Sequence, residues 1–315
     1  MQIVQAPRAS AILYGILTAR RENYPWLLPA NICPIVPITF LKAQVPFRFV
    51  DISAETLHMD LEQAKALARK RRFGGLLYAH TYGEPSTPNE FFESTRQISP
   101  ETLIIDDRCL CAPDLQPDPV NQADVQLYST GYAKIVDLGF GGYAFMRADI
   151  DYQPAHLSFD PDQDGPLEKS YKSSIARRVQ FVYQDSDWLD TQSPVPAWNV
   201  YQRQIEENLT KSLQQRASLN RIYANMLPGE IQLPDRFQNW RFNVCLKNKQ
   251  GVLEKIFSAG LFASSHYASL ADIMGRGRAP QAESLAARVI NLFNDDHFTL
   301  DQAEQVCKII LENLA

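Results

Sequence analysis

The chain has 315 residues, of which 45% are hydrophobic and 21% charged, an ordinary balance for a folded protein with room for a large domain and a smaller companion. The net charge of −5 gives no attraction to nucleic acid or anionic lipid, and no apolar run approaches the roughly 18 residues that span a membrane. The five cysteines are odd in number and scattered, which favours free thiols and indicates no zinc site. The first residues lack the apolar core of a signal peptide, so we expect a cytoplasmic protein.

Helical and extended patterns alternate along the first half of the chain. Apolar residues at helical spacing predict helices over 10–21, 35–43, 60–71 and 91–98. Short apolar runs predict buried strands over 26–28, 47–52, 76–79, 103–105 and 125–128. This alternation is typical of a doubly wound α/β domain with a mostly parallel sheet.

The second half of the chain divides into an irregular segment and a helix-rich unit. Residues 149–200 are rich in Asp, Gln, Pro and Ser and predict a surface excursion or subunit-contact arm, with a helix near 168–184. Beyond them the pattern predicts helices over 201–227, 251–259 and 299–313 and a strand over 240–246. We therefore predict a large domain over 1–204 and a small α+β domain over 205–315.

Two predicted strands end in residues that can meet one ligand. Asp106 and Asp107 close one strand, whereas Ser129 ends the next and Lys134 follows five residues later. The carboxyl ends of strands in an open α/β sheet face the ligand crevice. Pyridoxal phosphate needs a lysine for a Schiff base and a carboxylate beside its pyridine nitrogen. Most lysines are solvated surface groups, but the small and apolar neighbours of Lys134 are unusual for one.

Phosphate contacts are predicted at two places. Ser129 lies beside the backbone N–H groups around Gly131, although Ser-Thr-Gly is also ordinary turn chemistry. A helix starting near Ser10 would present free N–H groups to an anion, or Ser10 would serve only as its N-cap.

The positions of several further polar residues can be interpreted in two ways. His80 follows a strand end and either reaches the crevice or bonds to backbone beneath its loop. His266 would overhang the cleft between the domains. Four arginines could bind a carboxylate or phosphate, or could lie on the surface as most arginines do. They are Arg8, Arg241, Arg276 and Arg278.

The stretches LIIDDRCL, ADVQLYSTGYAK and GFGGYAF together resemble the core of the DegT/StrS-type sugar aminotransferases, pyridoxal phosphate enzymes of fold type I. Scattered similar stretches extend over residues 8–312. The resemblance implies that Asp107 pairs with the ring nitrogen, Ser129 binds the phosphate and Lys134 carries the cofactor.

The sequence also departs from that family pattern. The usual N-terminal extension is missing, and the Gly-Thr of the phosphate cup is replaced, which leaves Ser10 and Ala11 as phosphate contacts. The ring-stacking aromatic falls at Asn31 and Cys33, and the usual polar residue three places after the aspartate is Leu110. The histidine usual two places after the serine is Gly131, and the asparagine motif that reaches the partner's phosphate is not found in residues 149–200.

The resemblance implies a cytoplasmic, homodimeric aminotransferase that moves an amino group from a glutamate-like donor to a nucleotide-linked keto-sugar, in polysaccharide or secondary-metabolite biosynthesis. The substrate contacts would include Arg241, His266 and Arg276. Two alternatives stay open: a family member that binds the cofactor with altered or lost transamination, and a cofactor-free interaction protein on the same fold.

Overall fold

The computed structural model describes residues 1–20 and 24–314. Residue 21, the last of the predicted 10–21 helix, and residue 315, the last of the predicted small domain, lie outside the described residues. The strands of the large domain are β1 (Gln2–Ala6), β2 (Trp26–Pro29), β3 (Phe47–Val50), β4 (Gly75–Ala79), β5 (Leu103–Asp107), β6 (Val125–Ser129) and β7 (Gly142–Met146). The helices of this domain are α1 (Ala9–Ala19), α2 (Ile35–Lys42), α3 (Leu61–Lys70), α4 (Asn89–Ile98) and α5 (Asp164–Arg177).

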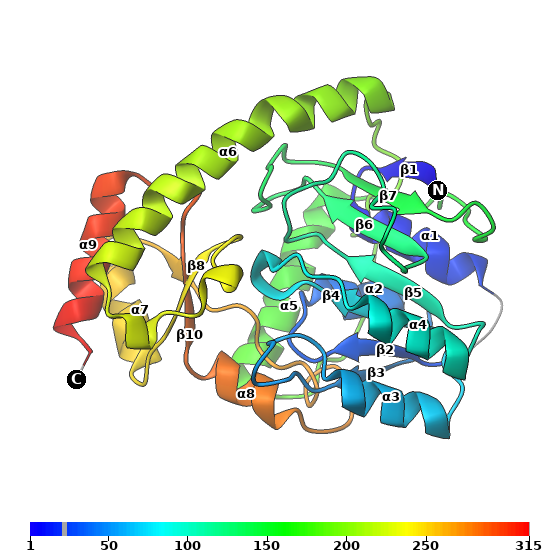
Figure 1. Cartoon of the computed structure of the whole chain (residues 1–315), viewed down its shortest axis with the longest axis horizontal. Helices are drawn as coiled ribbons and strands as arrows, with labels where there is room; N and C mark the ends of the chain where they lie inside the picture. Colours follow the sequence, from blue (N-terminus) through cyan, green and yellow to red (C-terminus); the bar gives the residue numbers. More distant parts are fainter. Residues whose placement is uncertain (21–23, 315) are drawn as a thin grey trace.

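Within the described residues these strands form one sheet in the order β1-β7-β6-β5-β4-β2-β3. The pairs from β3 through β6 are parallel, and β7 is antiparallel to both β6 and β1. The predicted doubly wound, mostly parallel α/β fold is confirmed (Figure 1). The edge strand β1 has no strong apolar pattern, and the sequence did not predict it.

Helices cover the two faces of the sheet and bury alternate residues of each strand. Leu77 and Ile105 pack in one cluster with residues of α1 and α2. Their neighbours Leu76 and Ile104 pack in another cluster with residues of α3 and α4. This alternation, which follows from the two-residue period of a strand, decides which strand-end side chains face a given cavity.

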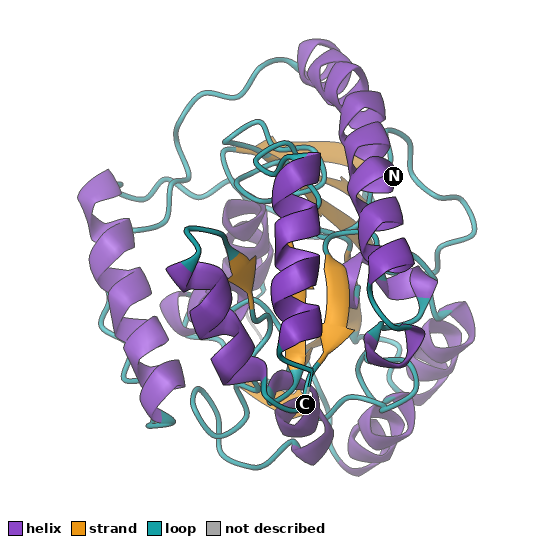
Figure 2. Ribbon diagram, turned by 90° about the vertical axis from the view of Figure 1, so that its left-hand side faces the viewer, coloured by secondary structure: helices purple, strands orange, loops and turns teal. Residues whose placement is uncertain are grey.

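The small domain contains β8 (Phe242–Cys245), β9 (Ala263–Ser264) and β10 (Val289–Leu292), with β10 antiparallel to both neighbours. Its helices are α7 (Lys249–Ser258), α8 (Pro280–Ala286) and α9 (Leu300–Glu312). The predicted capping box is present, because Thr299 and Gln302 exchange hydrogen bonds at the start of α9. Figure 2 shows α9 on the outer side of this domain.

The long helix α6 (Trp198–Met226) joins the two domains. Tyr201 and Ile205, near its start, pack with Tyr128 of the large sheet. Leu219 and Tyr223, near its end, belong to the small-domain core. The predicted limits at 204 and 205 therefore fall inside a helix that both domains share, and the division stays a prediction.

The segment predicted as a surface excursion lies against the large domain. Its helix, α5, begins four residues before the predicted one and ends at Arg177, and the C-cap residue Arg178 has a φ of +49°. Trp188 and Leu189 are buried in the cluster that contains the α1 and α2 residues.

In the described part of the chain, no helix has the length and apolar character that crossing a membrane requires.

Candidate active site

A cavity of about 250 Å³ opens at the carboxyl ends of β4, β5 and β6, beside the N-terminus of α1. It brings together predicted residues from distant parts of the sequence. The predicted residues that line it are Arg8, Ser10, Asn31, Cys33, His80, Asp107, Ser129 and Lys134. The cavity therefore contains the lysine, the carboxylate and the anion-binding end that the sequence predicted for one ligand.

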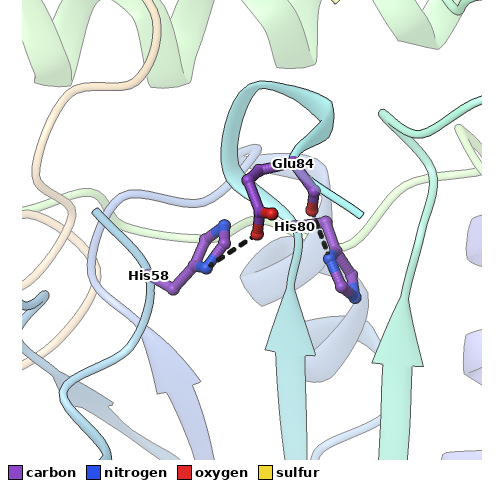
Figure 3. A group of neighbouring side chains, drawn as sticks. All are labelled: His58, His80 and Glu84. Carbon is purple, nitrogen blue, oxygen red and sulfur yellow. Dashed lines mark hydrogen bonds and ion pairs between the residues drawn. The ribbon is translucent and has the colours of Figure 1, made fainter. Parts of the chain in front are cut away.

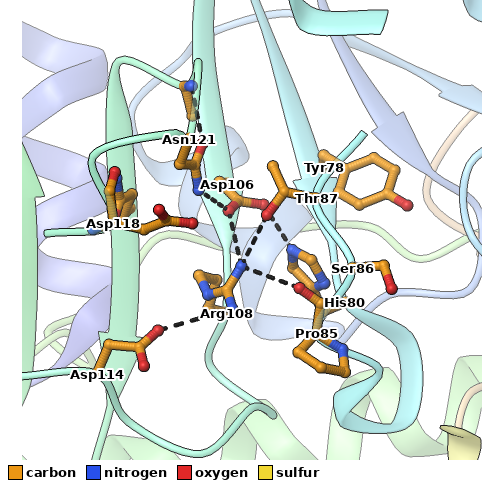
Figure 4. A network of polar contacts seen from close by, with 12 residues as sticks. Tyr78, His80, Pro85, Ser86, Thr87, Asp106, Arg108, Asp114, Asp118 and Asn121 are labelled. Carbon is orange, nitrogen blue, oxygen red and sulfur yellow. Dashed lines mark hydrogen bonds and ion pairs between the residues drawn. The ribbon is translucent and has the colours of Figure 1, made fainter. Parts of the chain in front are cut away.

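Strand alternation separates the two adjacent carboxylates. Asp107 lies on the side of β5 that faces α1, lines the cavity, and accepts a hydrogen bond at Oδ1 from the Cys109 N–H (3.0 Å). Asp106 points to the opposite side, where it lies 2.6 Å from His80 Nε2 and accepts from Asn121 Nδ2 at 2.7 Å (Figure 4). Of this pair, Asp107 alone is in a position to meet a ligand in the cavity.

Asp106 is the centre of a buried ionic network. Burial by itself would raise the pKa of Asp106, but the His80 imidazole and the Arg108 guanidinium, 3.3 Å away, more than offset that effect and hold the pKa below its usual value. The carboxylate therefore accepts from His80, whose other ring nitrogen donates to the Glu84 carbonyl at 2.6 Å (Figure 3). His80 lines the cavity and is also bonded to backbone beneath its loop, so both sequence-based interpretations apply in part, and neither ring nitrogen is left without a protein partner.

Lys134 lies in the loop between β6 and β7 and is half-buried. The preceding residue, Ala133, has a left-handed φ of +59° and donates its N–H to Asp137 Oδ2 at 2.7 Å. Lys134 lines the cavity together with the thiols of Cys33 and Cys109. Burial raises the pKa of both Cys33 and Cys109, and the positive charge of Lys134 partly offsets that rise.

The anion-binding end is formed by α1 and the β6–β7 region. The first residue of α1, Ala9, follows Arg8, which makes no side-chain cap to the helix. A Cβ on Gly142 would lie 2.2 Å from the Ala9 nitrogen, so only glycine allows β7 to approach the helix start this closely. Ser129 Oγ accepts from the Gly131 N–H at 3.3 Å beside this end. The free N–H groups, the helix dipole and the hydroxyl fit a phosphate.

Ala11 does not fit its predicted role as a phosphate contact. Its N–H already donates to the Arg8 carbonyl at 3.0 Å, its side chain is buried in the core, and it does not line the cavity. Ser10, one residue earlier in the first turn, does line the cavity.

A buried polar atom with no protein partner indicates that the cavity is made for a polar ligand. Asn31 Nδ2 donates to the Leu57 carbonyl at 3.0 Å, but Asn31 Oδ1 has no hydrogen-bond partner among the described residues. Asn31 is 3% exposed and lines the cavity. Leaving such an atom unpaired is costly, so a bound group with a hydrogen-bond donor would be favoured here. Together with Asp107, Lys134 and the anion-binding end, this fits pyridoxal phosphate.

The three predicted substrate residues do not line the cavity. Arg241 is 2% exposed, forms an ion pair with Asp295, and lies over the Phe293 ring. His266 packs against Trp240, and burial with the nearby charge of Arg241 lowers its pKa to about 4. Arg276 is exposed in a surface loop. Arg241 is therefore structural, because its charge is already compensated inside the small domain.

Sequence reasoning missed Tyr267, the neighbour of His266. Tyr267 lines the cavity, is 9% exposed, and stacks on Trp240 with an interplanar angle of 10°. Burial raises the pKa of its phenol, and Cys33 and Asp107, which line the same cavity, raise it further. The strand end SSHY did indicate the cleft, but the predicted residue was the histidine and not the tyrosine that follows it.

No protein-family model matches the sequence, and no curated protein sequence matches it either. The fold, in contrast, is similar to many solved structures. A DegT DnrJ EryC1 StrS aminotransferase from Brucella abortus has 15% identity and a TM-score of 0.69, covering 100% of this chain and 86% of its own. The sugar aminotransferase CalS13 from Micromonospora echinospora has 19% identity and a TM-score of 0.69, covering 99% and 87%. DesI, solved in the presence of its TDP-sugar product, has 14% identity and a TM-score of 0.72, covering 98% and 80%.

The chain therefore has the fold of the pyridoxal phosphate-dependent transferases of fold type I. Within that class its fold is that of the DegT/DnrJ/EryC1/StrS aminotransferases, which confirms at the level of the fold the resemblance that the motifs predicted.

Proposed function

We propose that this protein is a pyridoxal phosphate-dependent aminotransferase that takes an amino group from an amino acid such as glutamate and transfers it to a nucleotide-linked keto-sugar. The observation that carries this proposal is that Asp107 and Lys134 line one cavity at the N-terminus of α1. The sugar acceptor rests on the similarity of the fold to sugar aminotransferases. The proposal includes a cytoplasmic location and a place in polysaccharide or related biosynthesis.

Each residue of the cavity has a role in the proposed reaction. When bound, pyridoxal phosphate supplies an electron sink for the charge that develops at the substrate carbon. Lys134 would hold the cofactor through Nζ and, once released by the amino donor, carry a proton to and from that carbon. Asp107 would hold the proton on the pyridine nitrogen through a charge-assisted hydrogen bond. Ser129 and the start of α1 would bind the phosphate.

Tyr267 and Asn31 complete the proposed cavity. The Tyr267 ring, backed by Trp240, would exclude water from the side of the small domain and offer an aromatic face that Asn31 and Cys33 do not. Asn31 Oδ1 would accept a hydrogen bond from a donor on the bound group.

We also propose a homodimer. Tyr132 is 79% exposed although it lines the cavity, which supports a second subunit covering this mouth. Light scattering at several protein concentrations tests this directly, and a monomer throughout would contradict it.

The test of the function is absorbance of the purified protein with pyridoxal phosphate, before and after borohydride, in the wild type and in Lys134→Ala. We expect the wild type to gain a visible band that borohydride removes and the variant to lack it. Glutamate should then change the wild-type spectrum. A band without any change on adding amino acids would favour a family member with lost transamination, for which Leu110 in the cavity is the specific observation. A colourless wild type would leave only the cofactor-free interaction protein.

A further inference from the structure

Three successive backbone carbonyls around the lysine accept hydrogen bonds from side chains outside its loop. Trp240 Nε1 donates to the Ala133 carbonyl at 2.7 Å, and Arg216 Nη2 donates to the Lys134 carbonyl at 3.1 Å. Ser212 Oγ donates to the Ile135 carbonyl. Ser212 and Arg216 come from α6. Trp240 lies two residues before β8 of the small domain. The peptide that bears Lys134 is thus bonded to the segments that join the domains.

Arg216 is the hub of this arrangement. Its Nη1 donates to the Trp240 carbonyl at 2.5 Å and to Asn294 Oδ1 at 2.6 Å, and its Nε donates to Ser212 Oγ at 3.2 Å. Arg216 is 3% exposed, and its hydrogen-bond acceptors in these contacts are all uncharged. Burial lowers the pKa of Arg216 to about 10, although the nearby charges of Asp295, Asp296 and Asp137 oppose that shift, so keeping a cation here is costly.

We propose that Arg216, Trp240 and Ser212 are positioning residues that fix the backbone of the lysine loop, and so make the orientation of Lys134 depend on the position of the small domain. The proposal rests on the proposed function, because it assigns a purpose to the orientation of that lysine. The Arg216 guanidinium makes four hydrogen bonds, to Ser212, Trp240, Asn294 and the Lys134 carbonyl, whereas a lysine has three donors and an apolar residue has none.

The lysine loop is held both by a bond within it and by bonds to side chains outside it. Ala133 is in a left-handed conformation, which costs free energy for a non-glycine residue and persists only where the surroundings hold it. The Asp137 bond to the Ala133 N–H is made within the loop, whereas the three carbonyl bonds are made to α6 and to Trp240. Small displacements of a reacting group lower reaction rates strongly, so a shift of these supports would act on Lys134 directly.

The test uses Trp240→Phe, which removes one N–H and keeps a ring against Tyr267, together with Arg216→Lys and Ser212→Ala. The matched control is Tyr223→Phe on the same helix, which removes a buried bond to the Phe293 carbonyl (2.7 Å) and touches no residue of the lysine loop. Three quantities are measured: the rate at which the visible band appears with pyridoxal phosphate, hydrogen exchange over residues 131–138, and the acetylation of Lys134 relative to Lys70 in cofactor-free protein.

We expect Trp240→Phe to slow appearance of the band about fivefold and Arg216→Lys about tenfold, with faster exchange over 131–138 and altered labelling of Lys134. Tyr223→Phe should lower the Tm and change none of the three. The proposal would be overturned if Trp240→Phe lowered the Tm as much as Tyr223→Phe does while its rate, exchange and labelling stayed at their wild-type values. If Arg216→Lys does not fold, Trp240→Phe and Ser212→Ala decide the question. If the wild type forms no band, the proposed function fails, while exchange and labelling still decide whether these side chains hold the loop.

Discussion

His80 Nε2 and Asp106 Oδ1 lie 2.6 Å apart, and both side chains are fully buried. His80 lines the cavity, whereas Asp106 does not and lies on the opposite face of β5 from Asp107. Because Asp106 also accepts from Arg108 and Asn121, it fixes the end of the strand that carries the proposed cofactor carboxylate.

Asp106→Asn should destabilise the protein by about 3 kcal/mol, since it leaves buried cationic groups without their carboxylate. Urea unfolding measures this loss. Asp114→Asn is the matched control, because its side chain is 48% exposed and lies 3.7 Å from the same Arg108. Its effect should stay below about 1 kcal/mol. Similar losses in both variants would contradict a special role of the buried pair.

Stability should fall as the pH is lowered from neutral. Burial, with the nearby charge of His80, lowers the pKa of His58 to about 3, whereas an unfolded histidine has its ordinary 6.5. Between these values the unfolded chain binds a proton that the folded protein does not, so the unfolding free energy decreases by up to about 1.4 kcal/mol per pH unit. His58→Asn should have a shallower slope between pH 6.5 and 4 in urea titrations. An unchanged slope would show that His58 is not buried in its neutral form.

Asp107→Asn should keep the cofactor band at Lys134 but slow the reaction with an amino-acid donor by on the order of 100-fold, because an amide cannot hold the ring nitrogen protonated as a carboxylate does. Stopped-flow absorbance with glutamate measures this step. A wild-type rate in Asp107→Asn would remove this residue from the proposed mechanism.

Tyr267→Ala should weaken binding of pyridoxal phosphate about fivefold, because it removes an aromatic face backed by Trp240. Tyr267→Phe keeps the ring and should bind nearly as the wild type does. Equilibrium titration of Lys134→Ala protein carrying each change measures the non-covalent part alone. Equal affinities for the alanine and phenylalanine variants would count against ring contact.

Gly142→Ala should disrupt the anion-binding end, because its Cβ would lie 2.2 Å from the Ala9 nitrogen and something must shift. We expect a loss of at least about 2 kcal/mol in stability, with weaker binding of inorganic phosphate. Gly165→Ala in α5 meets nothing within 4 Å and should be neutral or slightly stabilising. Thermal melts with and without phosphate separate the two variants.

Local sequence patterns predicted most of the elements and the anchor residues, but not the edge strand β1. Short apolar strands and amphipathic helices have distinct periods, so the α/β class was readable from local pattern. Lys134, Asp107 and Ser129 stood at strand ends, where a parallel sheet presents side chains to a ligand, and the structure places all three on one cavity.

The tertiary structure decided which groups are free to act. The bond of His80 to Asp106 and the buried ion pair of Arg241 depend on partners 26 and 54 positions away in the sequence, which no local pattern reveals. The same holds for Tyr267, which lines the cavity while the segment that follows it is bonded to the large domain through the Leu270 N–H and the Ala30 carbonyl (2.9 Å). Chemical type and spacing can propose a residue for a site, but burial and hydrogen-bond partners, which arise from long-range packing, determine whether its polar atoms remain available.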